Sequence, residues 1–121
     1  MTITIYHNPR CSKSRKTLEL IENAGISAEI VAYLDTPPDG PRVLELAKLL
    51  EIPVNGLLRR GEAEFREASD LPDLDDDAGL AAWLSHHPRV IERPIVVDTS
   101  NAANPRAVIG RPPENVLALL A

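Results

Sequence analysis

The first 34 residues constrain the fold most, because they predict a strand, a helix and a second strand in quick succession. Residues 2–6 alternate polar and apolar side chains and are rich in β-branched residues, which is typical of a strand. Apolar side chains at helical spacing predict a helix over residues 12–23, with Gly25 as its stop. Residues 28–34 are mostly apolar and predict the second strand. Two strands joined by a helical crossover are expected to be parallel.

The rest of the chain adds a helical segment, a β-hairpin and a last helix. Helical patterns fill much of residues 41–87, and a turn joins two predicted antiparallel strands, residues 95–98 and 106–109. A Pro-Pro pair then opens the last helix. A chain of 121 residues with 44% hydrophobic content supports one domain with one core. We expect a single α/β domain over residues 1–121 that resembles the thioredoxin fold: a mixed four-stranded sheet flanked by helices, with a helical insertion at about 41–87.

Charge is distributed unevenly along the chain. The formal net charge is −5, which argues against a general surface for nucleic acid or anionic membrane. Residues 1–16 nevertheless contain no acidic side chain, whereas the rest of the chain contains all 18. A basic island in an acidic protein predicts a local binding site for an anion. The basic side chains of this island are Arg10, Lys13, Arg15 and Lys16.

Hydropathy bears on the location of the protein. No run of about 18 apolar residues is present, so no transmembrane helix is predicted. The first residues alternate in polarity and lack the basic start and apolar block of a signal peptide. We therefore expect a cytoplasmic monomer with neither a membrane nor a nucleic acid as partner.

Cys11 is the single cysteine, which excludes an internal disulfide. It lies where the first strand leads into the first helix, and there free backbone N–H groups and the helix dipole stabilise anions. The same groups, together with nearby Arg and Lys side chains, lower the pKa of a thiol. The pattern predicts that Cys11 is a nucleophilic thiolate; the alternative is an inert, buried cysteine beneath a solvated basic helix face.

Ser14 stands three residues after Cys11, where a dithiol oxidoreductase carries its second cysteine. Because serine cannot resolve a mixed disulfide, an adduct on Cys11 has to be released by an external thiol such as glutathione or a glutaredoxin. Two roles are open for the Ser14 side chain. It can donate a hydrogen bond to the Cys11 sulfur, or it can cap the first helix, as Ser12 also can.

Several separate motifs resemble the glutaredoxin-coupled arsenate reductase family, the ArsC type, and within it the YfgD-like branch. They occur in the family's order and cover nearly the whole chain. The matching segments are Tyr6-His7-Asn8-Pro9-Arg10-Cys11-Ser12-Lys13-Ser14-Arg15, Tyr33-Leu34-Asp35-Thr36-Pro37-Pro38, Leu57-Leu58-Arg59, Glu92-Arg93-Pro94-Ile95-Val96-Val97 and Ile109-Gly110-Arg111-Pro112.

The resemblance implies a thioredoxin-like fold, arsenate as the substrate and Cys11 as the nucleophile. It implies no bound cofactor, and glutathione and glutaredoxin as external reductants. The family's histidine before the loop falls on His7, its loop serine on Ser14, and the cis-proline that faces the active cysteine on Pro94. Three arginines that hold the oxyanion fall on Arg59, Arg93 and Arg111, and Arg15 is added to this oxyanion-binding set.

Binding of an oxyanion by several arginines is also expected on chemical grounds, because a planar guanidinium group can donate paired hydrogen bonds to a tetrahedral oxyanion. Chemistry alone does not separate Arg59 from its neighbour Arg60; only the motif favours Arg59. Arg10 and Lys13 stand where the well-known arsenate reductases have small or neutral residues, and they match the YfgD-like branch instead.

Two other functions compete with arsenate reduction. One is a non-enzymatic interaction protein, because the wider superfamily includes a transcriptional regulator that binds RNA polymerase; that regulator carries a Cys-x-x-Cys switch, which Ser14 rules out. The other is a glutaredoxin-like thiol oxidoreductase. No metal site is expected at His86 and His87, because adjacent helical residues point in different directions and no third ligand is near in the sequence.

Overall fold

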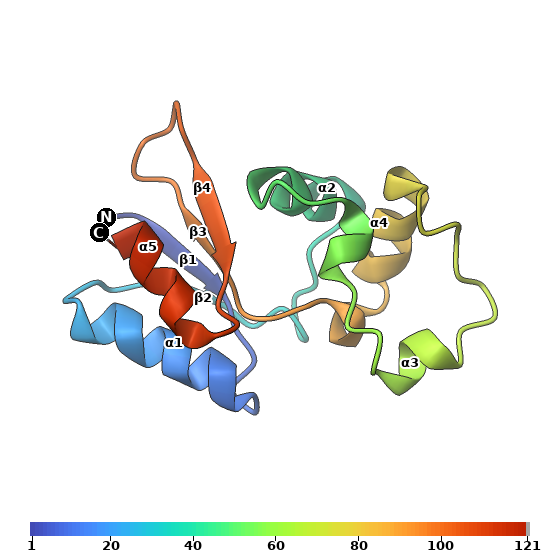
Figure 1. Ribbon diagram of the computed structural model, residues 1–121, viewed down its shortest axis with the longest axis horizontal. Coiled ribbons are helices and arrows are strands. Elements are labelled where there is room, and N and C mark those ends of the chain that lie inside the picture. Colours follow the sequence, from blue (N-terminus) through green and yellow to red (C-terminus); the bar gives the residue numbers. More distant parts are fainter. Residues whose placement is uncertain (121) are drawn as a thin grey trace. The chain divides into compact units, whose positions relative to one another are not determined.

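The computed structural model describes residues 1–120 and divides them into two compact units (Figure 1). The first unit combines Met1–Tyr33 with the residues from Arg93 onward, and the second unit is Leu34–Glu92. The helical insertion expected at about 41–87 therefore belongs to a unit that begins and ends several residues further out. Within residues 1–120, no helix is long and apolar enough to cross a membrane.

The first unit contains a mixed four-stranded sheet in the order β2-β1-β3-β4. Strands β1 (Ile3–Tyr6) and β2 (Glu29–Val31) are parallel, as the crossover pattern predicts. Strand β3 (Ile95–Asp98) is antiparallel to β1, and β4 (Arg106–Ile109) is antiparallel to β3. The predicted strand, helix and hairpin pattern of this unit is thus confirmed.

Strand β2 is shorter than the expected range of 28–34. Pairing with β1 involves only three residues, because β1 ends at Tyr6 and one further hydrogen bond, from the His7 N–H to the Val31 carbonyl (2.9 Å), completes the ladder. Pro9 follows shortly afterwards and cannot donate to a sheet. Strand β1 and the loop after it therefore offer no hydrogen-bonding groups to residues 32–34, although these residues continue the apolar pattern of β2.

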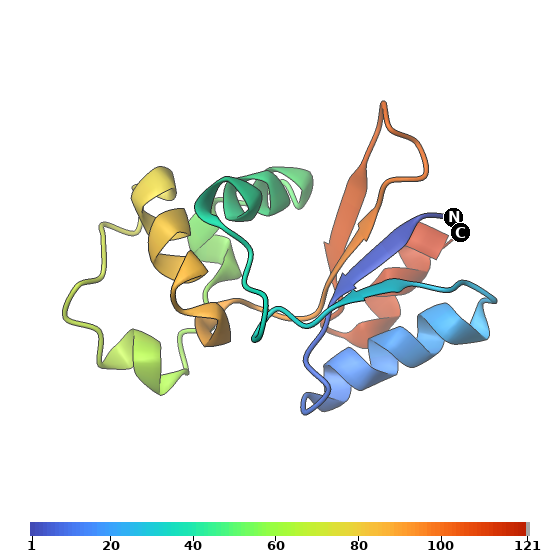
Figure 2. The ribbon, with the colours of Figure 1, turned by 180° about the vertical axis from the view of Figure 1, so that it is seen from behind.

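Helix α1 (Ser12–Asn23) connects β1 to β2 and covers one face of the sheet together with α5 (Leu117–Leu120), as Figure 1 and Figure 2 show. Gly25 ends α1 with a φ of 78°, a conformation that glycine adopts without steric cost. The 3₁₀ helix η3 (Pro113–Val116) precedes α5, so the predicted last helix is split into two short turns. The core between helices and sheet is purely aliphatic and contains Ile3, Ile5, Ile21, Val96, Val116 and Leu119.

Capping of α1 differs from the sequence expectation, which placed the cap on Ser12 or Ser14. Both serines lie inside the helix, and the N-cap residue is Cys11, whose side chain makes no capping hydrogen bond. The orphan N–H groups of the first turn are therefore not taken by a hydroxyl. These free N–H groups remain available to stabilise negative charge at the start of the helix.

The second unit is helical and contains α2 (Gly40–Leu49), η1 (Val54–Leu57), α3 (Ala63–Arg66), α4 (Asp77–Ser85) and η2 (Pro88–Val90). Asp39 caps α2 by accepting from the Arg42 N–H, and Asp76 caps α4 by accepting from the Gly79 N–H. An antiparallel bridge between Leu58 and Ile91 joins the segment after η1 to the segment after η2. Its interior is formed by Val43, Leu46, Ala47, Val54, Leu57, Leu80, Ala81, Leu84 and Val90.

An ion pair between a buried carboxylate and an exposed arginine closes the hairpin of the first unit. Asp98 is only 5% exposed; Arg106, its cross-strand partner, donates to it at 2.9 Å, and the Ser100 N–H donates at 2.8 Å. Burial raises the pKa of the Asp98 carboxyl, but the hydrogen bonds from Ser100 and the charge and hydrogen bond of Arg106 lower it more, so the pKa lies below its ordinary value. Arg106 also donates to the Leu119 carbonyl (3.1 Å), which ties α5 to the hairpin.

We predict that the Asp98→Asn variant loses about 1–2 kcal/mol of stability at pH 7. A carboxyl whose folded pKa is depressed stabilises the protein above its unfolded pKa, and this contribution disappears as the pH falls through the folded pKa. Urea unfolding at pH 7 and near pH 3 measures this, and the gap between wild type and variant should close at the lower pH. The matched control is Asp75→Asn, an exposed carboxylate; a pH-independent gap for Asp98 would contradict the assignment.

Candidate active site

Cys11 is half-buried at the point where the loop after β1 enters α1. Its N–H donates to the Asn8 carbonyl (3.0 Å), and its own carbonyl accepts from the Arg15 N–H (3.0 Å). The backbone N–H groups of Ser14 and Lys13, in the first turn of α1, act on the sulfur and lower the pKa of the thiol. The first turn of the helix therefore stabilises negative charge on the sulfur, although no side chain caps it.

The electrostatics of this turn favour ionisation of the thiol. Burial raises the pKa of Cys11, whereas the N–H groups of Ser14 and Lys13 and the hydrogen bond and charge of the Arg93 side chain lower it. The lowering contributions together outweigh burial, and the pKa of Cys11 falls below its ordinary value. A thiolate is the nucleophilic form of cysteine, so the site contains an activated nucleophile.

Ser14 serves a purpose that the sequence did not suggest. Its side chain is fully buried, and its Oγ lies 2.6 Å from His7 Nδ1 and accepts from the Asn8 N–H at 3.0 Å. The sulfur of Cys11 is contacted by the Ser14 backbone N–H, so the hydroxyl neither caps the helix nor supplies this contact. The hydroxyl instead fastens the loop to the helix from the inside.

His7 is buried next to this hydroxyl. Burial and the positive charge of Arg15 lower the pKa of His7, so the imidazole is neutral at physiological pH. Depending on its tautomer, a neutral ring either donates a hydrogen bond to the Ser14 hydroxyl or accepts one from it. Arg15 itself lies on the exposed side of the loop, where its Nη1 donates to the Pro9 carbonyl (2.9 Å). Its place among the oxyanion ligands stays a prediction.

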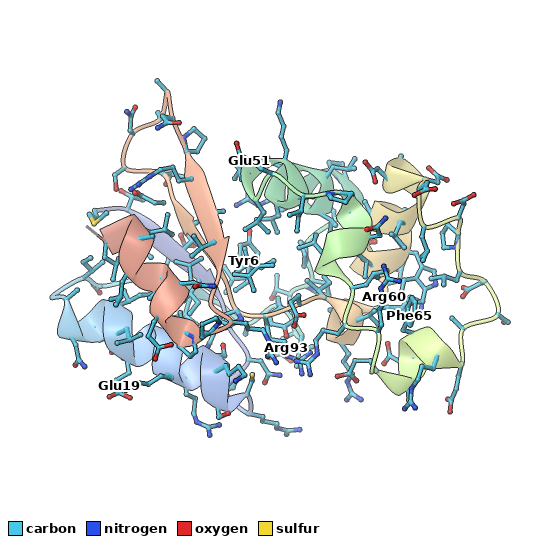
Figure 3. All side chains as sticks on the ribbon, viewed as in Figure 1. Tyr6, Glu19, Glu51, Arg60, Phe65 and Arg93 are labelled. Atoms are coloured by element: carbon cyan, nitrogen blue, oxygen red, sulfur yellow. The ribbon has the colours of Figure 1, made fainter. Side chains whose placement is uncertain are left out.

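The sheet register brings two of the predicted arginines to the end of the sheet where Cys11 lies. Tyr6, the last residue of β1, pairs with Ile95, and Ile95 pairs with Ile109, so the segments just before β3 and just after β4 meet at this edge. Arg93 and Arg111 stand in these two segments. Figure 3 shows Arg93 at the end of the sheet where α1 begins, consistent with its hydrogen bond to the Cys11 sulfur.

Packing fixes this edge more tightly than sequence reasoning indicated. The Gly110 N–H donates to the Pro94 carbonyl (2.9 Å). A Cβ atom on Gly110 would lie 2.5 Å from Thr17 Oγ1 and 2.9 Å from Pro94 Cγ. Helix α1 and the segments that carry Arg93 and Arg111 therefore meet at a point that accommodates only glycine. The sequence signal was a glycine directly after an apolar strand, which can mark such a close approach.

Both arginines at this edge are followed by cis peptide bonds, Arg93–Pro94 and Arg111–Pro112. The family resemblance implied a cis bond only at Pro94. Arg59 lies in the other unit, where its N–H donates to the Val90 carbonyl (2.7 Å) and its Nε lies 3.7 Å from Glu62 Oε1. Its role as a third oxyanion ligand stays a prediction.

His86 and His87 are not part of a cluster of metal-binding side chains; residues 1–120 contain no group of three or more His, Cys, Asp or Glu suited to a metal ion. The ring of His87 stacks on Trp83, with centroids 4.0 Å apart, and its Nδ1 lies 3.3 Å from Glu64 Oε2. Trp83 is buried, and its Nε1 donates to Asp70 (3.0 Å). These contacts show an aromatic pair bordered by two carboxylates in the second unit.

We predict that Cys11 reacts with iodoacetamide faster at pH 7 than free cysteine does, because its pKa is lowered. The Arg93→Gln variant should shift the midpoint of the alkylation profile to higher pH and slow labelling at pH 7 by about three- to tenfold. The Lys16→Gln variant removes the same charge from α1, where Lys16 Nζ lies 3.5 Å from Glu19, and should change the profile little. Identical profiles for wild type and Arg93→Gln would refute the assigned contact.

The structure thus defines a thioredoxin-like α/β protein with one cysteine at the start of its first helix. Solved structures share this architecture: the arsenate reductase from Vibrio cholerae is 43% identical, has a TM-score of 0.83, and the match covers 98% of this chain and 97% of that one. The sequence model of the ArsC family matches residues 6–119. The chain therefore belongs to the ArsC family, as its motifs indicated.

Named relatives match over nearly their whole lengths. The arsenate reductase of Neisseria meningitidis serogroup A is 46% identical over 120 residues, which is 98% of this chain and 97% of the relative. The uncharacterized protein YfgD of Escherichia coli is 40% identical over 119 residues, covering 98% and 96% of the two chains. The resemblance to the YfgD-like branch is thereby confirmed.

Proposed function

We propose that this protein is an arsenate reductase that uses Cys11 as its nucleophile. The observation that supports this most directly is the group of donors that lower the pKa of the Cys11 thiol, namely the N–H groups of Ser14 and Lys13 and the Arg93 side chain. These groups stabilise negative charge on the sulfur and stand ready to stabilise a neighbouring oxyanion. Relatives at 40–46% identity that carry the name arsenate reductase support the choice of substrate.

In the first step, the Cys11 thiolate attacks arsenic and forms a sulfur–arsenic bond, while one arsenate oxygen leaves as water after taking up protons. Arg93 offsets the charge of the incoming anion, and Arg111, in the adjoining segment, offers a second guanidinium. Arg59 is proposed as the third and Arg15 as a further positive group. His7 acts by its neutral contact with Ser14, which holds the loop, rather than by removing a proton from a thiol that is already acidic.

In the following steps, reducing electrons come from outside the chain, because Ser14 replaces the second thiol and Cys11 is the single cysteine. Glutathione adds to arsenic with loss of a second water. A glutaredoxin thiolate then attacks the glutathione sulfur; the new disulfide forms as the sulfur–arsenic bond breaks, and its two electrons reduce arsenic. Water releases arsenite and returns Cys11 to the thiol. No bound cofactor takes part in this sequence.

The test is reduction of arsenate by the purified protein with glutathione and a glutaredoxin present together or one at a time. We expect turnover that requires both, and arsenite as the product. Mass spectrometry of the protein treated with arsenate and glutathione alone should show an adduct on the Cys11 peptide. Turnover with no dependence on added thiol, or no turnover with both, would disprove the proposal.

The same assay addresses the glutaredoxin-like alternative. A thiol oxidoreductase would reduce glutathione mixed disulfides without an oxyanion site. Arsenate should therefore protect wild-type Cys11 from alkylation, and Arg93→Ala should lose this protection. Rapid reduction of mixed disulfides with no protection by arsenate would favour the alternative.

A further inference from the structure

The basic side chains around Cys11 differ in what they contact. Arg93 donates to the sulfur, Arg15 donates to the Pro9 carbonyl, and Lys16 lies 3.5 Å from Glu19. Arg10 and Lys13 are exposed, and no ion pair or side-chain hydrogen bond engages either of them within residues 1–120. Two cations next to the nucleophile are thus available to bind an anion from outside the chain.

The backbone of both residues is held next to Cys11. The Arg10 N–H donates to the side chain of the buried Asn8 (3.0 Å), and Lys13 lies in the first turn of α1. One cation precedes Cys11 by a single residue and the other follows it by two. The side chains extend into solvent from the rim of the thiol site, whereas Arg93 reaches the sulfur itself.

We propose that Arg10 and Lys13 form a docking site for the carboxylates of the thiol that attacks the Cys11 adduct, and that they select an anionic thiol such as glutathione. This inference rests on the proposed function, in which an external thiol releases Cys11. Glutathione carries one carboxylate at each end and its thiol in between. Cations flanking the reacting sulfur match that arrangement, because each carboxylate can approach one of them while the thiol faces Cys11.

The charge of the remaining chain gives exposed cations at this position a use. All 18 acidic residues lie outside the first 16 residues, so the protein as a whole repels an anionic reductant. Exposed cations within a Debye length of the reacting sulfur reverse that repulsion locally. A compact oxyanion is better served by Arg93, which already contacts the sulfur, than by two long side chains that point into solvent.

The test uses a Cys11 mixed disulfide with 2-thiopyridine and contains no arsenate. An incoming thiolate attacks the Cys11 sulfur, forms the new disulfide and expels thiopyridone, which is followed by its absorbance. Glutathione is compared with its diethyl ester, which lacks both carboxylates, with each rate expressed per thiolate. At low salt, wild type should prefer glutathione by about tenfold, from roughly threefold for each cation.

The preference should vanish in the Arg10→Gln/Lys13→Gln variant and in 0.5 M salt, and it should persist in Lys16→Gln, which removes one charge from the same helix. The Arg10→Glu/Lys13→Glu variant should prefer cysteamine, a cationic thiol. A double Gln variant that slows both thiols equally, or keeps the preference for glutathione, would overturn the inference.

A further arm separates this site from the oxyanion site. Protection of Cys11 by arsenate against iodoacetamide should be the same in wild type and in the double Gln variant. If that variant loses protection but keeps its thiol preference, the two cations belong to the oxyanion site and the inference fails. Failure of arsenate reduction itself leaves the disulfide assay intact, so the two proposals can fail separately.

Discussion

Replacing Cys11 with serine is expected to lower arsenate reduction by about 10³-fold or more, to the rate without enzyme. The donor groups of Ser14, Lys13 and Arg93 lower the pKa of the Cys11 thiol and so favour the thiolate, but they cannot ionise a hydroxyl. Serine also forms no sulfur–arsenic bond through which electrons can return to arsenic. The measurement is arsenite formation with glutathione and a glutaredoxin at saturating concentrations.

The matched control is Ser12→Ala, because Ser12 is the exposed neighbour of Cys11 in the same turn. This variant should keep wild-type activity within about threefold. Both variants should unfold at nearly the same temperature as wild type, since Cys11 makes no side-chain capping bond. If Cys11→Ser kept more than a tenth of the activity, the reaction would have to use another group.

The sheet could be predicted from the sequence because the patterns that define it involve residues close together in the chain. Alternation in residues 2–6 and the crossover length determine a parallel pair, and the turn after Asp98 determines the hairpin. The position of Cys11 at a helix start follows from the same local patterns. The family motif placed Arg93 at the site as an oxyanion ligand, since nothing local relates residues 82 positions apart in the chain; its contact with the sulfur was not predicted.

Failures of prediction came from contacts that depend on three dimensions. A serine at the start of a helix normally caps it, yet Ser14 is turned inward because His7 and the Asn8 N–H offer partners in the buried loop. Ser14 also lies inside the first turn, because Cys11 is the N-cap residue. The cap was therefore misassigned because the helix begins one residue before the serines could serve as its cap.

The Gly110→Ala variant is expected to show the second large effect. Its new methyl group would lie 2.5 Å from Thr17 Oγ1 and 2.9 Å from Pro94 Cγ, so α1 or the segment of Arg93 has to move. Overpacking of this kind destabilises by about 3 kcal/mol, which corresponds to a loss of roughly 10 °C in Tm. A shift of about 1 Å between Cys11 and Arg93 should also cost about 10²-fold in arsenate reduction.

The Gly61→Ala variant is the matched control, because nothing lies within 4 Å of a Cβ at Gly61. Its stability should change by less than about 0.5 kcal/mol. Combining Gly110→Ala with Thr17→Ala removes the closest overlap and should restore part of both stability and activity, although Pro94 still restricts the methyl group. Recovery in the double variant would show that the two effects have one steric origin. A stable, fully active Gly110→Ala protein would instead mean that this contact does not set the geometry of the site.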